Sequence, residues 1–482
     1  MPKKLLLIVI ALCALAAAPA AHASKTQESI FQDDRALIFM GDAQRQAALD
    51  QMKALGATTI HSLVFWNSIA PDASSKTKPA GFDGSDPNAY PAGAFDQYDA
   101  LVREAAARGL SLILSPVEAP AWAGRCGSLS IRNHCRPDPA EYGAFVTALG
   151  RRYSGTFAGL PRVSRWSFWN EPNQAGWLQP QQERKHGRNV PVAPALYRAL
   201  FRAGAAALSA SGHGKDQILL ADTAPLGQQT GPLGTRSLTP TAFLQSLFCL
   251  DSRGRALRGS AAKDQSCSGR YAKLAATGMA HHPYNRGGSQ PPLSRPGSGE
   301  ITIANISRLS ALLAQGARAH RISANLPIYF TEFGFQTNPP DHTFGVSLAK
   351  QAAWINQSDY IAYRNPRVKS VAQYELFDEP VLASFQTGLR FVNGSAKPSL
   401  DAYRLPIWVT RHGSGVSVWG QVRPAGDTHQ QVTIQNGNRA FKDVKTVTTG
   451  ANGYFVVNLP REAGPRWRLS WNGFTSRIAS VD

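Results

Sequence analysis

Cysteines and acidic residues are scarce in this chain of 482 residues. Five cysteines occur without a CxxC pair or a Cys/His cluster, so the ligand spacings typical of zinc sites are missing. The 51 Lys and Arg outnumber the 32 Asp and Glu, but they are scattered and form no basic block. We therefore expect no sequence-specific binding of nucleic acid. Cofactor motifs are absent as well, and we expect neither a cofactor nor a metal ion.

Long apolar runs are also missing, except at the N-terminus. There "MPKK" precedes "LLLIVIALCALAAA", and Ala21-His22-Ala23 has the small-x-small pattern of a cleavage site. We predict a signal peptide over residues 1–23, cleaved after Ala23; the alternative is an uncleaved anchor. The remaining chain should be secreted, monomeric and without stable membrane insertion. Its basic charge indicates either general solubility or attraction to acidic, envelope-associated glycans.

Four cysteines remain once the segment containing Cys13 is removed. An even number in an exported chain indicates disulfides, and three pairings are possible. The local pairing, Cys126–Cys135 with Cys249–Cys267, closes two short loops and needs no long-range coincidence. We predict this pairing, with a structural role.

Short apolar runs alternate with helical periodicity over most of the chain. Asp138, followed by Pro139, is typical of a helix start, and Phe145 and Leu149 then lie on one face. The pattern predicts an α/β fold, a (β/α)₈ TIM barrel over residues 24–406. A doubly wound sheet is the alternative, but it would favour a glycine-rich loop, which is missing. The eight predicted strands are 36–40, 58–66, 110–117, 165–171, 217–223, 278–284, 327–334 and 368–376.

The last part of the chain has a different pattern. Short alternating runs are separated by Gly and Asn turns, without helical periodicity. We predict a small all-β, sandwich-like domain over residues 407–482. A structural or interaction module is favoured over a carbohydrate-binding one.

Two predicted barrel strands end in glutamate, Glu171 and Glu332. The carboxyl ends of barrel strands form the active face, and an acid after an apolar run needs a reason because burying an unpaired charge is costly. Two carboxyls facing each other across a barrel mouth are what retaining glycoside hydrolysis requires. The alternative is two structural acids paired with arginines.

Three motifs make this interpretation more specific. "WNEPN" (169–173), "HHPY" (281–284) and "TEFG" (331–334) resemble the clan A glycoside hydrolases, families 5 and 39 above all. The resemblance implies that Glu171 is the proton donor (acid/base) and Glu332 the nucleophile. It implies that Asn170 binds the sugar 2-hydroxyl, that Tyr284 holds the nucleophile, and that His282 lines the same wall.

One departure from this pattern lies on the second strand. Many clan A enzymes have an arginine there that supports the nucleophile, whereas this chain offers His61. Either His61 substitutes for the arginine, the register differs by a residue or two, or His61 is a packed barrel histidine. Further acids follow other strands and are expected to contact sugar hydroxyls rather than to catalyse: Glu118, Asp222, Asp378 and Glu379.

Three tryptophans, Trp66, Trp122 and Trp177, follow strand ends. They are candidates for sugar-stacking subsites, with ordinary packing as the alternative. Together these patterns predict a secreted retaining hydrolase of β-linked glycans. The alternatives are a catalytically weak glycan-binding or envelope-attachment protein, and a transglycosylase.

Overall fold

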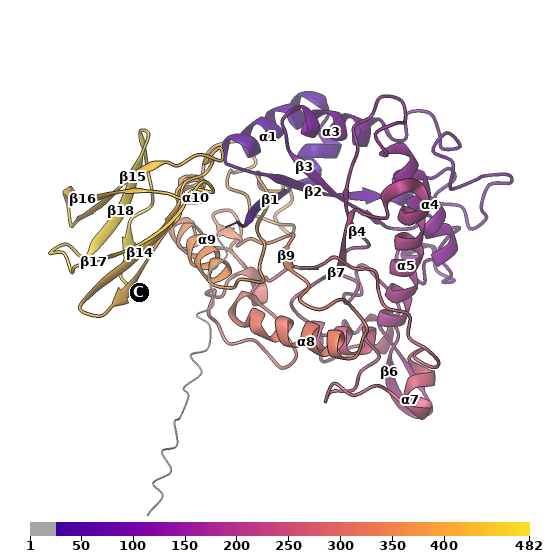
Figure 1. The fold of residues 1–482 in the computed structure, drawn as a ribbon. Helices are drawn as coiled ribbons and strands as arrows, with labels where there is room; N and C mark the ends of the chain where they lie inside the picture. The colour runs from indigo at the N-terminus through magenta and orange to yellow at the C-terminus, as the bar shows by residue number, and fades with distance from the viewer. Residues whose placement is uncertain (1–25) are drawn as a thin grey trace, which may run out of the picture.

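The computed structural model describes residues 26–482; the predicted signal peptide lies outside this range. Eight parallel strands form the barrel in the order β12-β1-β2-β3-β4-β7-β8-β9. Figure 1 shows helices such as α3 (Asp96–Ala107), α4 (Pro139–Arg152) and α8 (Ile306–Arg318) on the outside of these strands. A parallel bridge between Ile328 and Val368 joins the two ends of this order. The (β/α)₈ prediction is therefore confirmed. The strands are β1 Glu28–Gln32, β2 Thr59–Phe65, β3 Ser111–Val117, β4 Arg165–Ser167, β7 Gln217–Thr223, β8 Gly278–His281, β9 Ile328–Phe330 and β12 Ser370–Tyr374.

The first strand lies elsewhere than predicted. Residues 36–40 were expected to be extended, but Arg35–Phe39 forms a short helical turn, and β1 lies earlier in the chain. The buried carboxylate of Asp33 accepts a hydrogen bond from the Ala36 N–H at 2.9 Å and so stabilises the turn. Asp33 also accepts from two backbone N–H groups that follow β12. Contacts with residues more than 300 positions away in the chain thus favour a helical turn, although the local apolar run predicts a strand.

Helices and small hairpins surround the barrel. Asp138 caps α4 as predicted, accepting from the Ala140 N–H at 2.8 Å. The helices are α1 Asp42–Ala54, α2 Trp66–Ile69, α3 Asp96–Ala107, α4 Pro139–Arg152, α5 Ala193–Leu208, α6 Pro240–Leu247, α7 Gly259–Asp264, α8 Ile306–Arg318, α9 Leu348–Tyr363 and α10 Pro398–Arg404. β5 Gln182–Lys185 and β6 Arg188–Pro191 form an antiparallel hairpin, whereas β10 Thr337–Asn338 and β11 Val346–Ser347 form a short parallel pair. Within residues 26–482, none of the helices has the length and apolarity needed to cross a membrane.

The C-terminal region is all-β and has a hydrophobic core of its own. Both of its sheets contribute to this core, for example through Val418 and Leu469. A buried ion pair between Arg423 and Asp359 of α9, 3.0 Å, ties the region to the barrel. The strands of one sheet are β13 Ile407–His412, β14 Gly415–Gln421 and β17 Tyr454–Leu459; those of the other are β15 Gln431–Gly437, β16 Phe441–Thr448, β18 Arg466–Trp471, β19 Phe474–Thr475 and β20 Ala479–Ser480.

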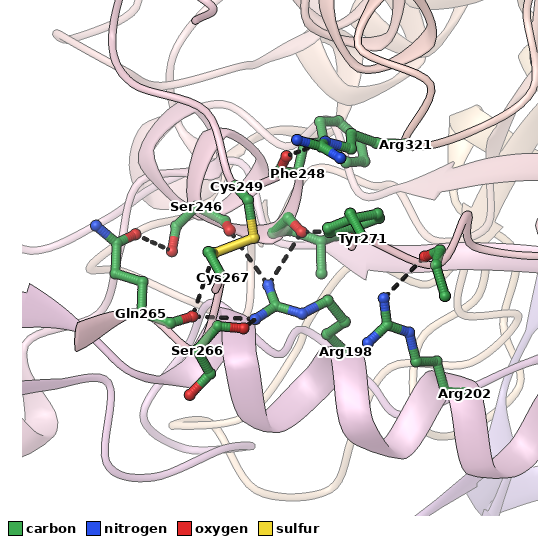
Figure 2. Close-up of a disulfide and its surroundings, with 12 residues drawn as sticks. Arg198, Arg202, Ser246, Phe248, Cys249, Gln265, Ser266, Cys267, Tyr271 and Arg321 are labelled. Carbon is green, nitrogen blue, oxygen red and sulfur yellow. Dashed lines mark hydrogen bonds between the residues drawn. A yellow bond between two sulfur atoms is a disulfide. The ribbon is translucent and has the colours of Figure 1, made fainter. Parts of the chain in front are cut away.

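Both predicted disulfides are present, Cys126–Cys135 and Cys249–Cys267. Figure 2 shows the second one beside the buried guanidinium of Arg198, which extends from α5. Arg198 has no carboxylate partner within the described residues. Instead it donates to four backbone carbonyl oxygens, those of Ser246, Leu247, Gln265 and Ser266, at 2.8–3.4 Å. Two of these carbonyls directly precede Cys267, so the guanidinium and the disulfide stabilise the same loop.

Replacing Arg198 with methionine is expected to destabilise the fold by about 2–4 kcal/mol, because four backbone carbonyls, two of them on buried residues, lose their donor. Chemical denaturation under oxidising conditions measures the loss. Arg202→Met is the matched control: its guanidinium is exposed and donates to one carbonyl, that of Ala272. We expect a change below about 1 kcal/mol for the control. Equal losses in the two variants would contradict the role of Arg198.

Candidate active site

Glu171 and Glu332 meet at the carboxyl ends of the barrel strands. Glu171 follows β4 by four residues, and Glu332 follows β9 by two. One carboxylate oxygen of each and a ring nitrogen of His282 all lie within 4.8 Å of one another. Glu332 is buried, and Glu171 is partly exposed. The structure therefore brings together the two acids predicted from separate motifs.

The backbone around these acids is strained. Trp169, Glu171 and Asp222 have positive φ angles of 65°, 37° and 39°, a region that residues other than glycine rarely adopt. Such conformations cost on the order of 1–3 kcal/mol each and persist where the surroundings enforce them. Here the Glu171 N–H donates to the carbonyl oxygen of Asp222 at 3.1 Å. The turn after β4 is thereby anchored to the end of β7, and the Glu171 side chain is directed into the barrel mouth.

Glu332 accepts a hydrogen bond from the hydroxyl of Tyr284 at 2.8 Å, as the motif resemblance implied. Burial raises the pKa of Glu332 to about 7, and the charge of Glu171 adds to the effect. His282 and Tyr284 oppose the shift by stabilising the carboxylate.

His282 lies between three carboxylates. Its Nδ1 is 3.0 Å from Glu171 Oε1 and 3.5 Å from Glu332 Oε2, and its Nε2 is 3.2 Å from Asp222 Oδ1. An ionised carboxylate only accepts hydrogen bonds, so when Glu171 and Asp222 are ionised both ring nitrogens donate and the ring is an imidazolium. Burial alone would lower the pKa of His282, but the three carboxylates outweigh burial and raise it well above its usual value. The site thus holds a fixed positive charge beside both glutamates.

Asp222 is the counter-ion of this imidazolium. It is fully buried and accepts from Ser167 Oγ at 2.8 Å and from the hydroxyl of Thr331. These contacts and His282 hold the pKa of Asp222 well below its usual range despite burial. The expectation that Asp222 contacts sugar hydroxyls is wrong, because its carboxylate is fully buried beneath the site and accepts hydrogen bonds from protein donors. The position of Asp222 at a strand end was the only feature of the sequence that pointed to a role in the site.

His61 does not take the place of the missing arginine. It is buried in the barrel, where Nε2 is 2.8 Å from Ser115 Oγ and 3.8 Å from Asp222 Oδ2. Burial lowers its pKa to about 4, so the ring is neutral. Within the described residues no hydrogen bond or ion pair joins it to Glu332, and it does not line the cavity described below. His61 is a packed barrel histidine, and the cation beside the nucleophile candidate is His282.

Replacing Asp222 with asparagine is expected to lower the pKa of His282, because one of its three carboxylates is lost. NMR of ¹⁵N-labelled histidine measures the titration. Asp216→Asn is the control, since Asp216 pairs with another histidine, His213, and should leave the His282 titration unchanged. An unchanged pKa in Asp222→Asn would contradict the assignment.

The pair of His282 and Asp222 also makes the free energy of unfolding depend on pH. The pKa of His282 is higher in the folded chain than the unfolded value of 6.5. Its contribution to the free energy of unfolding is therefore fully present below about pH 6.5 and is lost as the pH rises through the folded-state pKa. Asp222→Asn should accordingly cost more stability at pH 6 than at alkaline pH.

A cavity of about 610 Å³ opens above these residues. Of the three candidate tryptophans only Trp177 lines it. Trp66 is buried and stacks on Phe145 at 5.3 Å, so it has no face free for a sugar. Trp122 packs edge-on against Trp66 and donates to the Pro71 carbonyl at 3.0 Å. The residues around the cavity also include Asn170, Glu171, Tyr284 and Glu332.

The remaining acids at strand ends differ in their contacts and in whether they line the cavity. Glu118 accepts from the Asn67 amide at 2.9 Å and lies outside the cavity. Asp378 forms a buried ion pair with Lys397 at 2.6 Å. Glu379 does line the cavity, together with two acids that sequence analysis missed, Asp34 and Glu375. Those two follow β1 and β12, and the misplaced first strand concealed the position of Asp34.

The donor set does not favour a metal ion. Glu171, His282 and Glu332 offer three ligand atoms close together. A metal-binding histidine must be neutral with a free lone pair, whereas both nitrogens of His282 lie within hydrogen-bond distance of carboxylates, which raise its pKa and favour the imidazolium.

No protein-family model matches the chain, and no curated protein matches it. Three solved structures illustrate what it is similar to. A GH5_18 protein from Streptomyces cattleya in complex with GlcNAc is 15% identical over 79% of this chain and 79% of its own, with a TM-score of 0.49. A glycoside hydrolase family 30 subfamily 8 xylanase from Clostridium acetobutylicum is 12% identical over 92% and 95%, with a TM-score of 0.46. A GH1 beta-glucosidase from the fungus Humicola insolens in complex with glucose is 12% identical over 79% and 97%, with a TM-score of 0.46. Similarity at this level leaves mechanism and substrate to the chemistry of the site itself.

Proposed function

We propose that this protein is a secreted retaining glycoside hydrolase that cleaves β-linked glycans by double displacement. The observation that carries the proposal is the separation of the two carboxyls, whose oxygens lie within 4.8 Å of each other. Retaining enzymes place the two groups about 5–5.5 Å apart, whereas inverting enzymes need roughly 6.5–9.5 Å to admit a water molecule. The short separation supports direct attack by one carboxylate.

In the first step, Glu332 attacks the anomeric carbon and Glu171 donates its proton to the departing oxygen. The anomeric C–O bond breaks as the bond to Glu332 forms. In the second step, Glu171 takes a proton from water, and the oxygen of that water displaces Glu332. The hydroxyl of Tyr284 holds the attacking carboxylate in place. The imidazolium of His282 favours the ionised form of that carboxylate. Asn170 lines the cavity, its Oδ1 has no partner in the described chain, and its role in the proposal is to bind the sugar.

The proposal includes a division of labour along the chain. Residues 24–406 form the catalytic unit and residues 407–482 an accessory domain. Within the described chain, no residue beyond Phe385 lines the cavity. The C-terminal region instead packs Trp419 against Tyr363 of α9. We expect a monomer with a glycan as its partner.

The test is reducing-end release from β-linked polysaccharides and aryl glycosides, with Glu332→Gln in parallel. NMR of the first product should show the anomeric configuration of the substrate. Release of the inverted anomer would contradict the retaining mechanism. Glycan binding without turnover would favour a binding protein, and a product extended by a sugar acceptor would identify a transglycosylase.

A further inference from the structure

One side of the cavity carries an acidic wall, formed by Asp34, Glu375 and Glu379. The chain as a whole has a net charge of +19, yet Arg35 is the only Lys, Arg or His among the described residues lining the cavity. Its Nε lies 3.9 Å from Glu379 Oε2. With Glu171 and Glu332, five carboxyls share this cavity. The cavity lining is therefore rich in acidic groups, in a chain that is basic as a whole.

The acidic wall lies on the side of Glu332. Asp34 follows β1 and Glu375 directly follows β12, and these strands pair with Gln32 opposite Tyr374. On its other side, β12 is bridged to β9, the strand that precedes Glu332. The β4 and β7 side carries Glu171 and more apolar residues, among them Trp177 and Pro225. Since Glu171 protonates the leaving group, the sugar transferred to Glu332 is the one that meets the acidic wall.

Two residues that line the cavity, Gln32 and Glu375, each have one buried acceptor atom without a hydrogen-bond partner among the described residues. Glu375 Oε2 and Gln32 Oε1 are unpaired within the described chain, although each residue is only 2% exposed. Asp34 differs, because it accepts from Ser62 at 2.7 Å and from the Leu63 N–H at 3.0 Å. Leaving buried acceptors unpaired is costly, so hydrogen-bond donors bound at this side of the cavity would be stabilised.

We propose that the acidic wall binds the ammonium group of an amino sugar, so that the transferred residue is a β-linked hexosamine without its N-acetyl group. This inference rests on the proposed glycosidase activity and names its substrate class. An ammonium supplies three donors and one positive charge, and so matches unpaired acceptors among crowded carboxyls. A hydroxyl supplies one donor and no charge. Uronic acids are repelled, which favours general solubility over attraction to acidic glycans as the reason for the basic composition.

The charge environment is in line with this. Burial raises the pKa of Glu375 well above its usual value, and the nearby acids Asp33 and Glu379 raise it further. A bound cation relieves that repulsion, which a neutral sugar leaves in place.

The experiment compares 4-nitrophenyl β-glycosides of glucosamine, N-acetylglucosamine, glucose and glucuronic acid, with the galacto series alongside. We expect kcat/KM for the amine to exceed that of the N-acetyl and hydroxyl analogues by at least about tenfold. Glu375→Gln and Glu379→Gln should each bring the ratio towards one. Asp443→Asn, an exposed acid of β16, is the control and should leave the ratio unchanged. Equal or better turnover of the neutral or acidic glycosides would overturn the proposal.

Binding measurements test the amine preference independently of the proposed hydrolytic activity. Calorimetry with glucosamine oligomers, and with their N-acetylated counterparts, uses Glu332→Gln so that no turnover occurs. If Glu332→Gln binds the free-amine oligomers more tightly and the double variant Glu332→Gln/Glu375→Gln does not, the acidic wall binds the ammonium group. This result supports the inference even if no glycoside is hydrolysed. Hydrolysis that depends on Glu332 but shows no amine preference would overturn the substrate class and leave the glycosidase intact. Absence of both binding and amine turnover would also overturn it.

Discussion

Replacing Glu332 with glutamine is expected to reduce kcat/KM by about 10⁴-fold or more on every substrate, about 5–6 kcal/mol of transition-state stabilisation. The amide keeps the size of the side chain but cannot form the covalent intermediate. The loss should be independent of the leaving group, because bond formation at the anomeric carbon fails in all cases. Initial rates on aryl glycosides measure it.

A matched control for Glu332→Gln is Glu118→Gln. Glu118 lies on the same face of the barrel, but outside the cavity. It should retain activity within a few-fold of the wild type. In Glu332→Ala, added azide should restore release of an activated aryloxide by attacking the anomeric carbon from the vacated side, leaving a glycosyl azide of inverted configuration. A Glu332→Gln enzyme with more than a few per cent of wild-type activity would contradict the role of nucleophile.

Thermal unfolding of Glu332→Gln tests whether its loss of activity comes from misfolding. The folded-state pKa of Glu332, about 7, is above the unfolded value of 4.5, so ionisation of this buried group opposes folding as the pH rises through this interval. Glu332→Gln removes that cost and should unfold at a higher temperature than the wild type at pH 8. Stability lost at functional sites in this way is common.

Replacing Glu171 with alanine is expected to have an effect that depends on the leaving group. Glycosides with sugar leaving groups should lose about 10²–10⁴-fold in kcat/KM, because the departing oxygen needs a proton. Dinitrophenyl glycosides should lose far less, because dinitrophenolate leaves without one. The slope of log kcat/KM against leaving-group pKa, measured over a series of aryl glycosides, should steepen in the variant.

The Glu171 prediction has a second readout. Glu171 also activates water in the second step, so the glycosyl intermediate should accumulate on activated substrates and give a burst of aryloxide. Mass spectrometry of the quenched enzyme detects the adduct on Glu332. Equal losses on activated and unactivated substrates would contradict the acid/base assignment.

Local patterns determined a large part of this protein from sequence alone. Seven of the eight predicted barrel strands overlap observed ones, and the N-cap at Asp138 and both disulfides were predicted. These features depend on neighbours a few residues to tens of residues away, so periodicity and spacing reveal them. Glu171 and Glu332 were found for the same reason: each ends its own apolar run, and parallel strands place those ends on one face.

The tertiary structure alone decided what surrounds those two acids. The imidazolium of His282 exists because Asp222, Glu171 and Glu332 converge on it from three other strands. The exposure of Trp66 and Trp177 depends on side-chain packing, which a strand-end position does not encode.

The acidic wall was the feature least accessible from sequence. It joins Asp34 to Glu375, more than 300 residues apart, because β1 pairs with β12 when the barrel closes. The charge of each group follows from its neighbours in space, through burial and through Coulomb interactions that act over a few ångströms. Sequence alone therefore determined the chemistry available to this protein, and barrel closure decided which charges meet the sugar.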